Sequence, residues 1–113
     1  MEDLIKTHAV KTFAVAIGSG DNPKTIVAAV SGKKICVLSY IMSSATNGTY
    51  KWQSKPAGDA VDISGLIYLQ AAGTTVHTAP HAPRGWFVTA VGAALQIANS
   101  GIAGSVTGTY VEM

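Results

Sequence analysis

Charged residues are scarce in this sequence. They make up 12% of its 113 residues, whereas about a quarter of the residues in an ordinary soluble domain are charged. A domain of this size exposes much of its surface, so the scarcity predicts a surface that is largely neutral or apolar. Surfaces of that kind are often buried against other proteins. The composition is therefore typical of a protein that belongs to an oligomer or a larger assembly.

The sequence also lacks a basic cluster and a long apolar run. The net charge is +2, and the basic residues are scattered singly apart from Lys33 and Lys34. Proteins that bind nucleic acid gather basic residues on one surface, so no nucleic-acid partner is expected. No segment has the ~18 consecutive apolar residues of a membrane span, and residues 1–10 do not have the pattern of a signal peptide. We expect a protein without a membrane partner that is made in a cytoplasm.

Cysteine occurs once, at Cys36. A single cysteine excludes a disulfide within the chain, and this one lies in an apolar run. Its position predicts a buried, unreactive thiol.

Glycine is plentiful, and it separates apolar runs that have the length of β-strands. Twelve glycines divide the chain into apolar runs of roughly five to nine residues. Strands are predicted over 8–17, 24–30, 35–43, 49–53, 66–70, 75–78, 86–91, 94–98 and 105–112. About eight short strands at even spacing predict an all-β fold, a single antiparallel sandwich over residues 8–113. Greek-key pairing of the jelly-roll kind is favoured over a meander.

Three segments carry more detailed predictions. Residues 35–43 are apolar on both faces, so this strand is expected to be central and buried on both sides. The pair Asn47 and Gly48 predicts a type I′ hairpin turn. The alanine-rich segment 88–99 offers a helical alternative, but Gly92, the β-branched residues and the missing N-cap favour strands there. Turns are predicted at Gly73, at Gly92 and at 99–101.

The residues that could carry chemistry are few and scattered. The six acidic residues are spread over the termini, a turn and a loop: Glu2, Asp3, Asp21, Asp59, Asp62 and Glu112. His77 and His81 are four residues apart, but Pro80 and Pro83 exclude a helix that would bring them together as metal ligands. We therefore predict no catalytic residue, no metal site and no cofactor, and we expect the protein not to be an enzyme. The loop around these histidines could instead lie at a symmetry axis, where copies of one histidine meet.

Two adjacent aromatic residues indicate a contact surface. Trp86 and Phe87 lie in a predicted strand, so their side chains should point to opposite faces. If one packs in the core, the other faces outward. Aromatic residues are enriched at the centres of protein interfaces, so we predict that the outward one contacts another copy of the chain.

Four segments resemble small virion proteins of tailed bacteriophages, namely head decoration (cement) or head-fibre proteins built on a jelly-roll. The segments are 26–40 (IVAAVSGKKICVLSY), 52–54 (WQS), 85–95 (GWFVTAVGAAL) and 108–112 (GTYVE). They are strand and turn patterns, and the resemblance extends over nearly everything after Lys24.

The resemblance implies a homotrimer that binds the major capsid protein on the outer surface of a phage head and stabilises it. Residues 1–7, including Leu4 and Ile5, lie outside the sandwich pattern, so they form either an N-terminal arm that becomes ordered against the capsid or a frayed terminus. Further residues expected at the trimer or capsid interface are Trp86, Phe87, His77, His81 and Arg84. Two alternatives stay open: a head-fibre or receptor-binding module that holds a glycan at the rim 77–84, and a cupin-like metal enzyme, for which the sequence lacks a His and Glu cluster.

Overall fold

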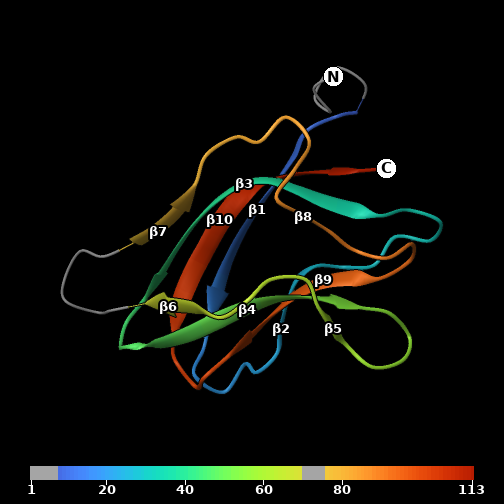
Figure 1. Cartoon of the computed structure of the whole chain (residues 1–113). Helices are drawn as coiled ribbons and strands as arrows, with labels where there is room; N and C mark the ends of the chain where they lie inside the picture. The colour runs from blue at the N-terminus through green and yellow to red at the C-terminus, as the bar shows by residue number, and fades with distance from the viewer. Residues whose placement is uncertain (1–7, 70–75) are drawn as a thin grey trace.

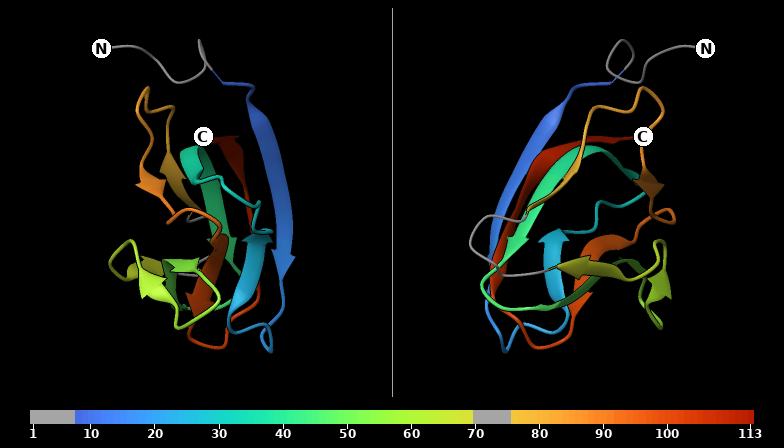
Figure 2. Two further views of the ribbon diagram at one scale, coloured as in Figure 1. Left: turned by 90° about the vertical axis from the view of Figure 1, so that its right-hand side faces the viewer. Right: turned by 60° about the vertical axis from the view of Figure 1, so that its left-hand side comes forward.

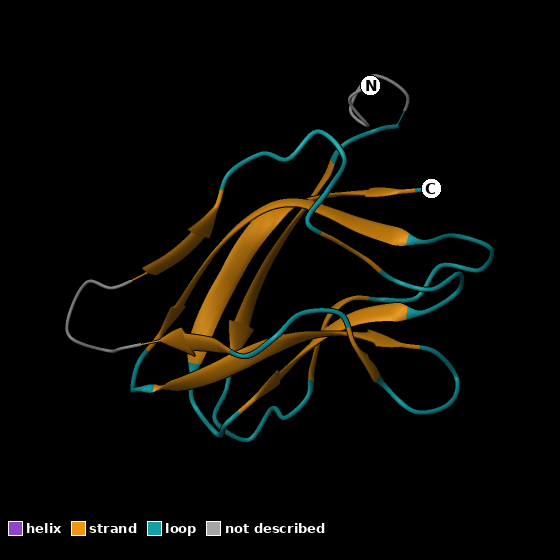
Figure 3. Cartoon of the chain, in the orientation of Figure 1, coloured by secondary structure: helices purple, strands orange, loops and turns teal. Residues whose placement is uncertain are grey.

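The computed structural model describes residues 8–69 and 76–113 of the chain. All the secondary-structure elements in that part of the chain are β-strands (Figure 3), so the predicted all-β fold is confirmed. Within it, no helix is long and apolar enough to cross a membrane. The helical alternative for 88–99 is wrong: β8 (Phe87–Val88) and β9 (Ala94–Asn99) lie there, separated by a turn at Gly92. The φ of Gly92 is 73°, a conformation that glycine adopts without strain.

Two antiparallel sheets face each other across the core, as Figure 1 and Figure 2 show from three sides. Sheet A contains, in hydrogen-bonding order, β1 (Lys11–Ile17), β10 (Gly104–Glu112), β3 (Ile35–Ser44) and β7 (Val76–Ala79), and β8 also pairs with β3. Sheet B contains β2 (Lys24–Val27), β9, β4 (Gly48–Lys55) and β5 (Val61–Asp62), and β6 (Ile67–Leu69) also pairs with β4. The predicted β-sandwich is confirmed.

An aromatic cluster lies at the centre of the core. Alternation along each strand turns every second side chain inward, and Trp52 is fully buried by this means. Its ring makes T-shaped contacts with Tyr40, at a centroid distance of 5.1 Å, and with Phe13, at 6.1 Å. Burying one large apolar side chain contributes on the order of 1.5–3 kcal/mol. Because Phe13 and Tyr40 belong to sheet A and Trp52 to sheet B, these contacts hold the two sheets together.

Gly108 makes room for part of this cluster. It lies directly opposite Phe13 in the ladder between β1 and β10. A Cβ atom at position 108 would lie 2.6 Å from the Phe13 ring and would collide with the carbonyl oxygen of Ser39. The ring of Phe13 therefore occupies the space that any side chain at position 108 would need, and only glycine leaves that space free.

A bulge divides β3 into two halves with different burial. The pairing of β10 with β3 skips Leu38, which is the extra residue. Up to Leu38 the strand is buried on both faces, and Cys36 and Leu38 pack with Val111 in a small second cluster. Beyond the bulge the two faces differ, and Ile41 is 54% exposed. Double-sided burial of 35–43 is thus confirmed for the first half of the strand and wrong for the second.

The connection from β3 to β4 is not a hairpin. A type I′ turn requires positive φ at both central residues, and neither Asn47 nor Gly48 has one. The two strands lie in different sheets, so the chain crosses the sandwich at this point. Gly48 begins β4 close to the turn that follows β9, where a Cβ atom would lie 2.6 Å from Ser100 Oγ and from Ile102 Cγ2. The glycine serves close packing rather than a left-handed turn.

Several strand boundaries differ from the predicted ones. The strand expected over 24–30 ends at Val27, and that expected over 86–91 contains only Phe87 and Val88. The two-residue β5 was not predicted, because two residues are too few to show the apolar alternation of a strand. The strands expected at 66–70 and 75–78 correspond to β6 and β7. Gln70, the turn at Gly73, Thr75 and the arm 1–7 lie outside the described residues.

Candidate protein-contact face

The outer face of sheet A carries no ionisable side chain at the exposed and half-buried outward positions described in β1, β10, β3 and β7. These positions alternate with the core residues and pair across the strands in three rows, of which the second spans all four strands. We call them together the uncharged face: Thr12, Thr109 and Ser39 in the first row, Ala14, Thr107, Ile41 and Thr78 in the second, and Ala16, Ser105 and Ser43 in the third. Each of these side chains is exposed or half-buried.

Neighbouring hydroxyl groups on the uncharged face satisfy one another. The Oγ of Ser39 lies 2.6 Å from Thr109 Oγ1, and the Oγ of Ser43 lies 3.3 Å from Ser105 Oγ. A polar group that is buried without a partner costs about 1–3 kcal/mol. Because these hydroxyls are already paired, a protein that covers them leaves fewer polar groups unsatisfied, and the desolvation cost of the contact is reduced.

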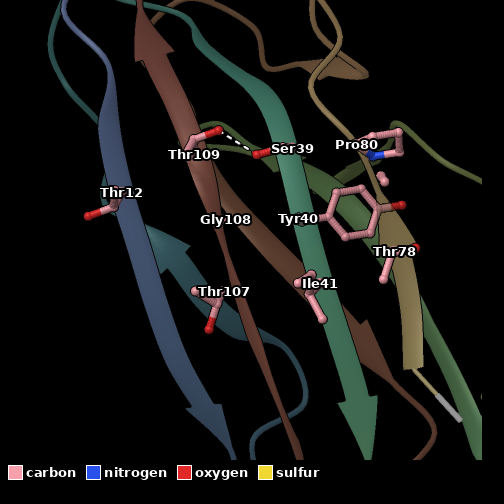
Figure 4. Close-up of a pocket in the computed structure, with 10 residues that line it drawn as sticks. Thr12, Ser39, Tyr40, Ile41, Thr78, Pro80, Thr107, Gly108 and Thr109 are labelled. Atoms are coloured by element: carbon pink, nitrogen blue, oxygen red, sulfur yellow. Dashed lines mark hydrogen bonds between the residues drawn. The ribbon is translucent and has the colours of Figure 1, made fainter.

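A groove of about 480 Å³ runs over this face (Figure 4). Its lining comes from β1, β10, β3 and β7 and ends at Pro80. The exposed Ile41 lines the groove and pairs with Thr107 across the ladder. An open groove with an isoleucine and uncharged neighbours can receive an apolar side chain from another protein, since the centres of protein interfaces are depleted of charge.

Trp86 is fixed beside the groove. Its indole N–H donates a hydrogen bond to the carbonyl oxygen of Pro80 at 2.8 Å, and its backbone N–H donates to Val37 O at 2.7 Å. A second backbone bond, from Ala82 N–H to Leu38 O at 2.9 Å, attaches the same loop to β3. The side chain of Trp86 is 47% exposed. A tryptophan that is already oriented loses little side-chain freedom when a partner covers it, and tryptophan is enriched among the residues that dominate binding energy.

Phe87 points away from Trp86 and into the core. Its ring centroid lies 5.9 Å from that of Trp52 and 6.1 Å from that of Tyr40. Trp86 directly precedes β8 rather than lying within it. The prediction that one aromatic residue packs in the core and the other faces outward is confirmed, and Trp86 is the outward one. A contact between Trp86 and a second copy of the chain stays a prediction.

The other predicted interface residues are divided between a strand and a loop. His77 lies in β7, not in a loop, and its Nε2 is 3.0 Å from the hydroxyl of Tyr40. His81 and Arg84 are exposed in the loop that also contains Pro80 and leads to Trp86. Leu4 and Ile5 lie outside the described residues. The structure therefore brings His81 and Arg84 near Trp86 in one loop and places His77 on the neighbouring strand.

Cys36 lies beneath the same loop. Its thiol is within 3.7 Å of the Arg84 carbonyl oxygen, and its side chain is buried. Gly85 passes so close that a Cβ atom there would collide with the sulfur, and its φ is 84°. Burial raises the pKa of the Cys36 thiol, which keeps the thiol protonated and poorly nucleophilic. The predicted burial of this cysteine is confirmed.

In residues 8–69 and 76–113, no three His, Cys, Asp or Glu side chains gather as a metal site would require. Among the acidic residues, Asp62 was predicted to lie in a loop. It lies instead in β5 and bonds the side chains of Gln53 and Lys51.

Trp86 was predicted from the sequence as a candidate outward-facing aromatic residue, but the uncharged face was not predicted. Part of the signal was visible, because Thr12, Ala14 and Ala16 alternate with the core residues of the first strand. The same alternation recurs at Thr107 and its neighbours near the C-terminus. What could not be read is the register that places these two distant segments side by side.

Comparisons with known proteins assign this chain to no family. No family model matches it, and neither a curated protein nor a solved structure matches it. Its function is therefore inferred from the chemistry of its own surfaces.

Proposed function

We propose that this protein is a non-catalytic structural component of a tailed-phage virion, a decoration (cement) protein on the outer surface of the head. In this role it forms a homotrimer and binds the major capsid protein. The observation that carries the proposal is the uncharged face with Trp86 at its edge, an exposed surface whose chemistry suits burial against protein. The resemblance of segments 26–40 and 85–95 to phage decoration proteins supports the virion assignment.

We further infer that the sandwich is a jelly-roll, and the support is its strand order. The chain passes from sheet to sheet as A, B, A, B over β1 to β4, continues in B with β5 and β6, returns to A with β7 and β8, and ends with β9 in B and β10 in A. With β5 and β6 counted as one interrupted strand, and β7 and β8 as another, each sheet has four strands. Their order is the one that two Greek keys produce in a double-sheet jelly-roll.

A trimer suits the task of holding a shell together. Each copy presents the same uncharged face, so every contact with the capsid is repeated three times. Linked contacts strengthen one another through effective concentration, without any contact being strong by itself. A face without charges also avoids the several kcal/mol that an unpaired buried charge costs.

The test compares two exposed aromatic residues on opposite faces of the sandwich. Trp86→Ala removes the anchored indole beside the uncharged face, and Tyr68→Ala removes an aromatic side chain from the outer face of sheet B. Light scattering gives the mass in solution, and co-sedimentation with undecorated heads gives capsid binding. We expect the unaltered protein and Tyr68→Ala to have three times the chain mass of 11.6 kDa and to bind heads.

For Trp86→Ala we expect trimer association to weaken by at least about thirtyfold, which corresponds to the ~2 kcal/mol of a strong interface residue. Thermal unfolding checks that the variant stays folded. An unaltered protein that is monomeric and does not bind heads would overturn the proposal, and so would a Trp86→Ala variant that assembles normally.

A further inference from the structure

The outer face of sheet B carries the most exposed large hydrophobic side chain in the described part of the chain. Tyr68, in β6, is 77% exposed and lies directly opposite Thr49 of β4. Leu66, two residues before it, is 52% exposed. A tyrosine left this open presents a flat apolar ring with a polar hydroxyl at its tip.

A row of hydrogen-bonded polar side chains lies beside Tyr68 on the same face. Gln96 Nε2 donates to Gln53 Oε1 at 2.7 Å, and Gln53 Nε2 donates to Asp62 Oδ1 at 2.9 Å. The ammonium of Lys51 lies 3.2 Å from Asp62 Oδ2. The hydrogen bond from Gln53 and the nearby Lys51 lower the pKa of Asp62. The carboxylate is therefore charged at neutral pH, and its orientation is set before any ligand arrives.

The backbone holds both parts of this surface in place. The segment that joins β5 to β6 is bonded to β4 at Trp52, whose N–H donates to Ser64 Oγ at 2.9 Å and whose carbonyl accepts from Ile63 N–H at 3.0 Å. Trp52 itself is fully buried in the core. Asp62 and Tyr68, on either side of this attachment, are thus fixed relative to the central strand, which is the condition for a preorganised binding site.

We propose that this face binds a neutral saccharide, with Tyr68 as its stacking platform. One face of a pyranose ring consists of C–H groups that pack on an aromatic ring, and its rim of hydroxyls both donates and accepts hydrogen bonds. The carboxylate of Asp62, the amide of Gln53 and the ammonium of Lys51 are the groups that would form hydrogen bonds with those hydroxyls. Outward residues two apart on β4 are about 6.7 Å from each other. A ring that lies over Tyr68 therefore has hydroxyls within reach of Lys51, and a second ring reaches Asp62.

A neutral ligand is favoured because the two charges of the site already balance. Lys51 is paired with Asp62. A charged sugar would therefore have to break that ion pair before it could form an ion pair with either residue. The site lies on the opposite face of the sandwich from the groove and away from the rim 77–84. It goes beyond the proposed function and does not depend on it, because a trimer bound through sheet A leaves sheet B open to solvent.

The experiment titrates the isotope-labelled protein with maltose, lactose and chitobiose while the backbone amide signals are followed by NMR. We expect saturable shifts with at least one disaccharide, confined to residues 49–53 and 61–69. Tyr68→Ala should weaken that binding at least tenfold, whereas Tyr68→Phe, which keeps the ring, should retain it. Trp86→Ala, on the other face, should bind the sugar as the unaltered protein does.

Four results would overturn the proposal. The first is no saturable shift with any of the three sugars, and the second is shifts centred on the groove of sheet A. The third is a Tyr68→Ala variant that binds as the unaltered protein does. Loss of trimer mass in Tyr68→Ala would also overturn it, since the aromatic side chain would then be a protein contact. Failure of the sugar titration with normal assembly would leave the proposed structural function standing.

Discussion

The two outer faces of the sandwich differ in chemistry although they rest on the same kind of support. Both belong to antiparallel five-stranded sheets that share one core. Sheet A presents hydroxyl, methyl and isoleucine side chains, whereas sheet B presents a row of amide, carboxylate and ammonium groups with Tyr68 at one side. Because inward residues form the core in both sheets, the difference is confined to the outward positions. Those positions can be altered one at a time with little effect on the fold.

The placement of charge follows the same division. Three ion pairs are found in the described residues, and none involves the uncharged face. The pair of Lys11 and Glu112 lies at the end of sheet A, where β1 begins and β10 ends. The pair of Lys51 and Asp62 lies on sheet B. A face that other proteins cover benefits from the absence of charge, while a face that stays in water can carry it.

A charge at the centre of the uncharged face should have the largest effect. We expect Thr107→Glu to abolish trimer formation and head binding, because assembly would bury a carboxylate without a partner. Thr107 is exposed, so the free energy of unfolding of the isolated chain should change by no more than about 0.5 kcal/mol. Light scattering and co-sedimentation measure assembly, and thermal unfolding measures stability.

Thr25→Glu is the matched control. Thr25 is also an exposed threonine in a strand, but it pairs with Gln96 in sheet B. The same new charge there should leave trimer mass and head binding unchanged. Equal loss of assembly in both variants, or normal assembly of Thr107→Glu, would contradict the division between the two faces.

A smaller effect should distinguish the faces by pH. The hydrogen bond from Gln53, together with Lys51, holds the pKa of Asp62 below its ordinary value of 3.8. A lowered pKa means that folding favours the carboxylate. The stabilisation is therefore complete above the unfolded-state pKa and is lost as the pH falls through the lowered, folded-state pKa. The uncharged face has no side chain that titrates in this range.

Gln53→Ala removes the main cause of the lowered pKa of Asp62, which is the hydrogen bond from Gln53. This pKa should therefore rise toward 3.8, as measured by an NMR titration of the Asp62 carboxyl carbon. Ser43→Ala, which breaks a hydroxyl pair on the opposite face, should leave that pKa unchanged. An unaltered protein in which Asp62 titrates at or above 3.8 would show that the row of hydrogen bonds on sheet B is absent in solution.

Local patterns in the sequence predicted much of the sandwich. Strands were predicted over 8–17 and 49–53, where β1 and β4 lie, and the turn predicted at Gly92 is present. The adjacent positions of Trp86 and Phe87 also predicted that their side chains point in opposite directions. These features depend on neighbours in the sequence, since side-chain direction in a strand repeats every two residues.

Features that depend on distant segments were missed or mistaken. Asn47 and Gly48 have the residues of a tight turn, but the pairing partners of β3 and β4 lie elsewhere in the chain and pull the two strands into different sheets. The bulge at Leu38 exists only relative to β10. The uncharged face arises in the same way, because it combines strands from opposite ends of the chain. The site around Tyr68 joins the consecutive strands β4, β5 and β6, and it was missed because β5 was not predicted.

The most direct test of the difference between the faces is maleimide labelling of single cysteines in the assembled particle. Thr107→Cys reports on sheet A and Thr25→Cys on sheet B, and the buried native Cys36 contributes little background. Each variant in a Trp86→Ala background, at a concentration where the weakened trimer dissociates, gives the reference rate. On decorated heads we predict that the cysteine at 107 reacts far more slowly than its reference, while the cysteine at 25 reacts at its reference rate. Equal reactivity at the two positions, or protection at 25 alone, would contradict the assignment of sheet A as the assembly face.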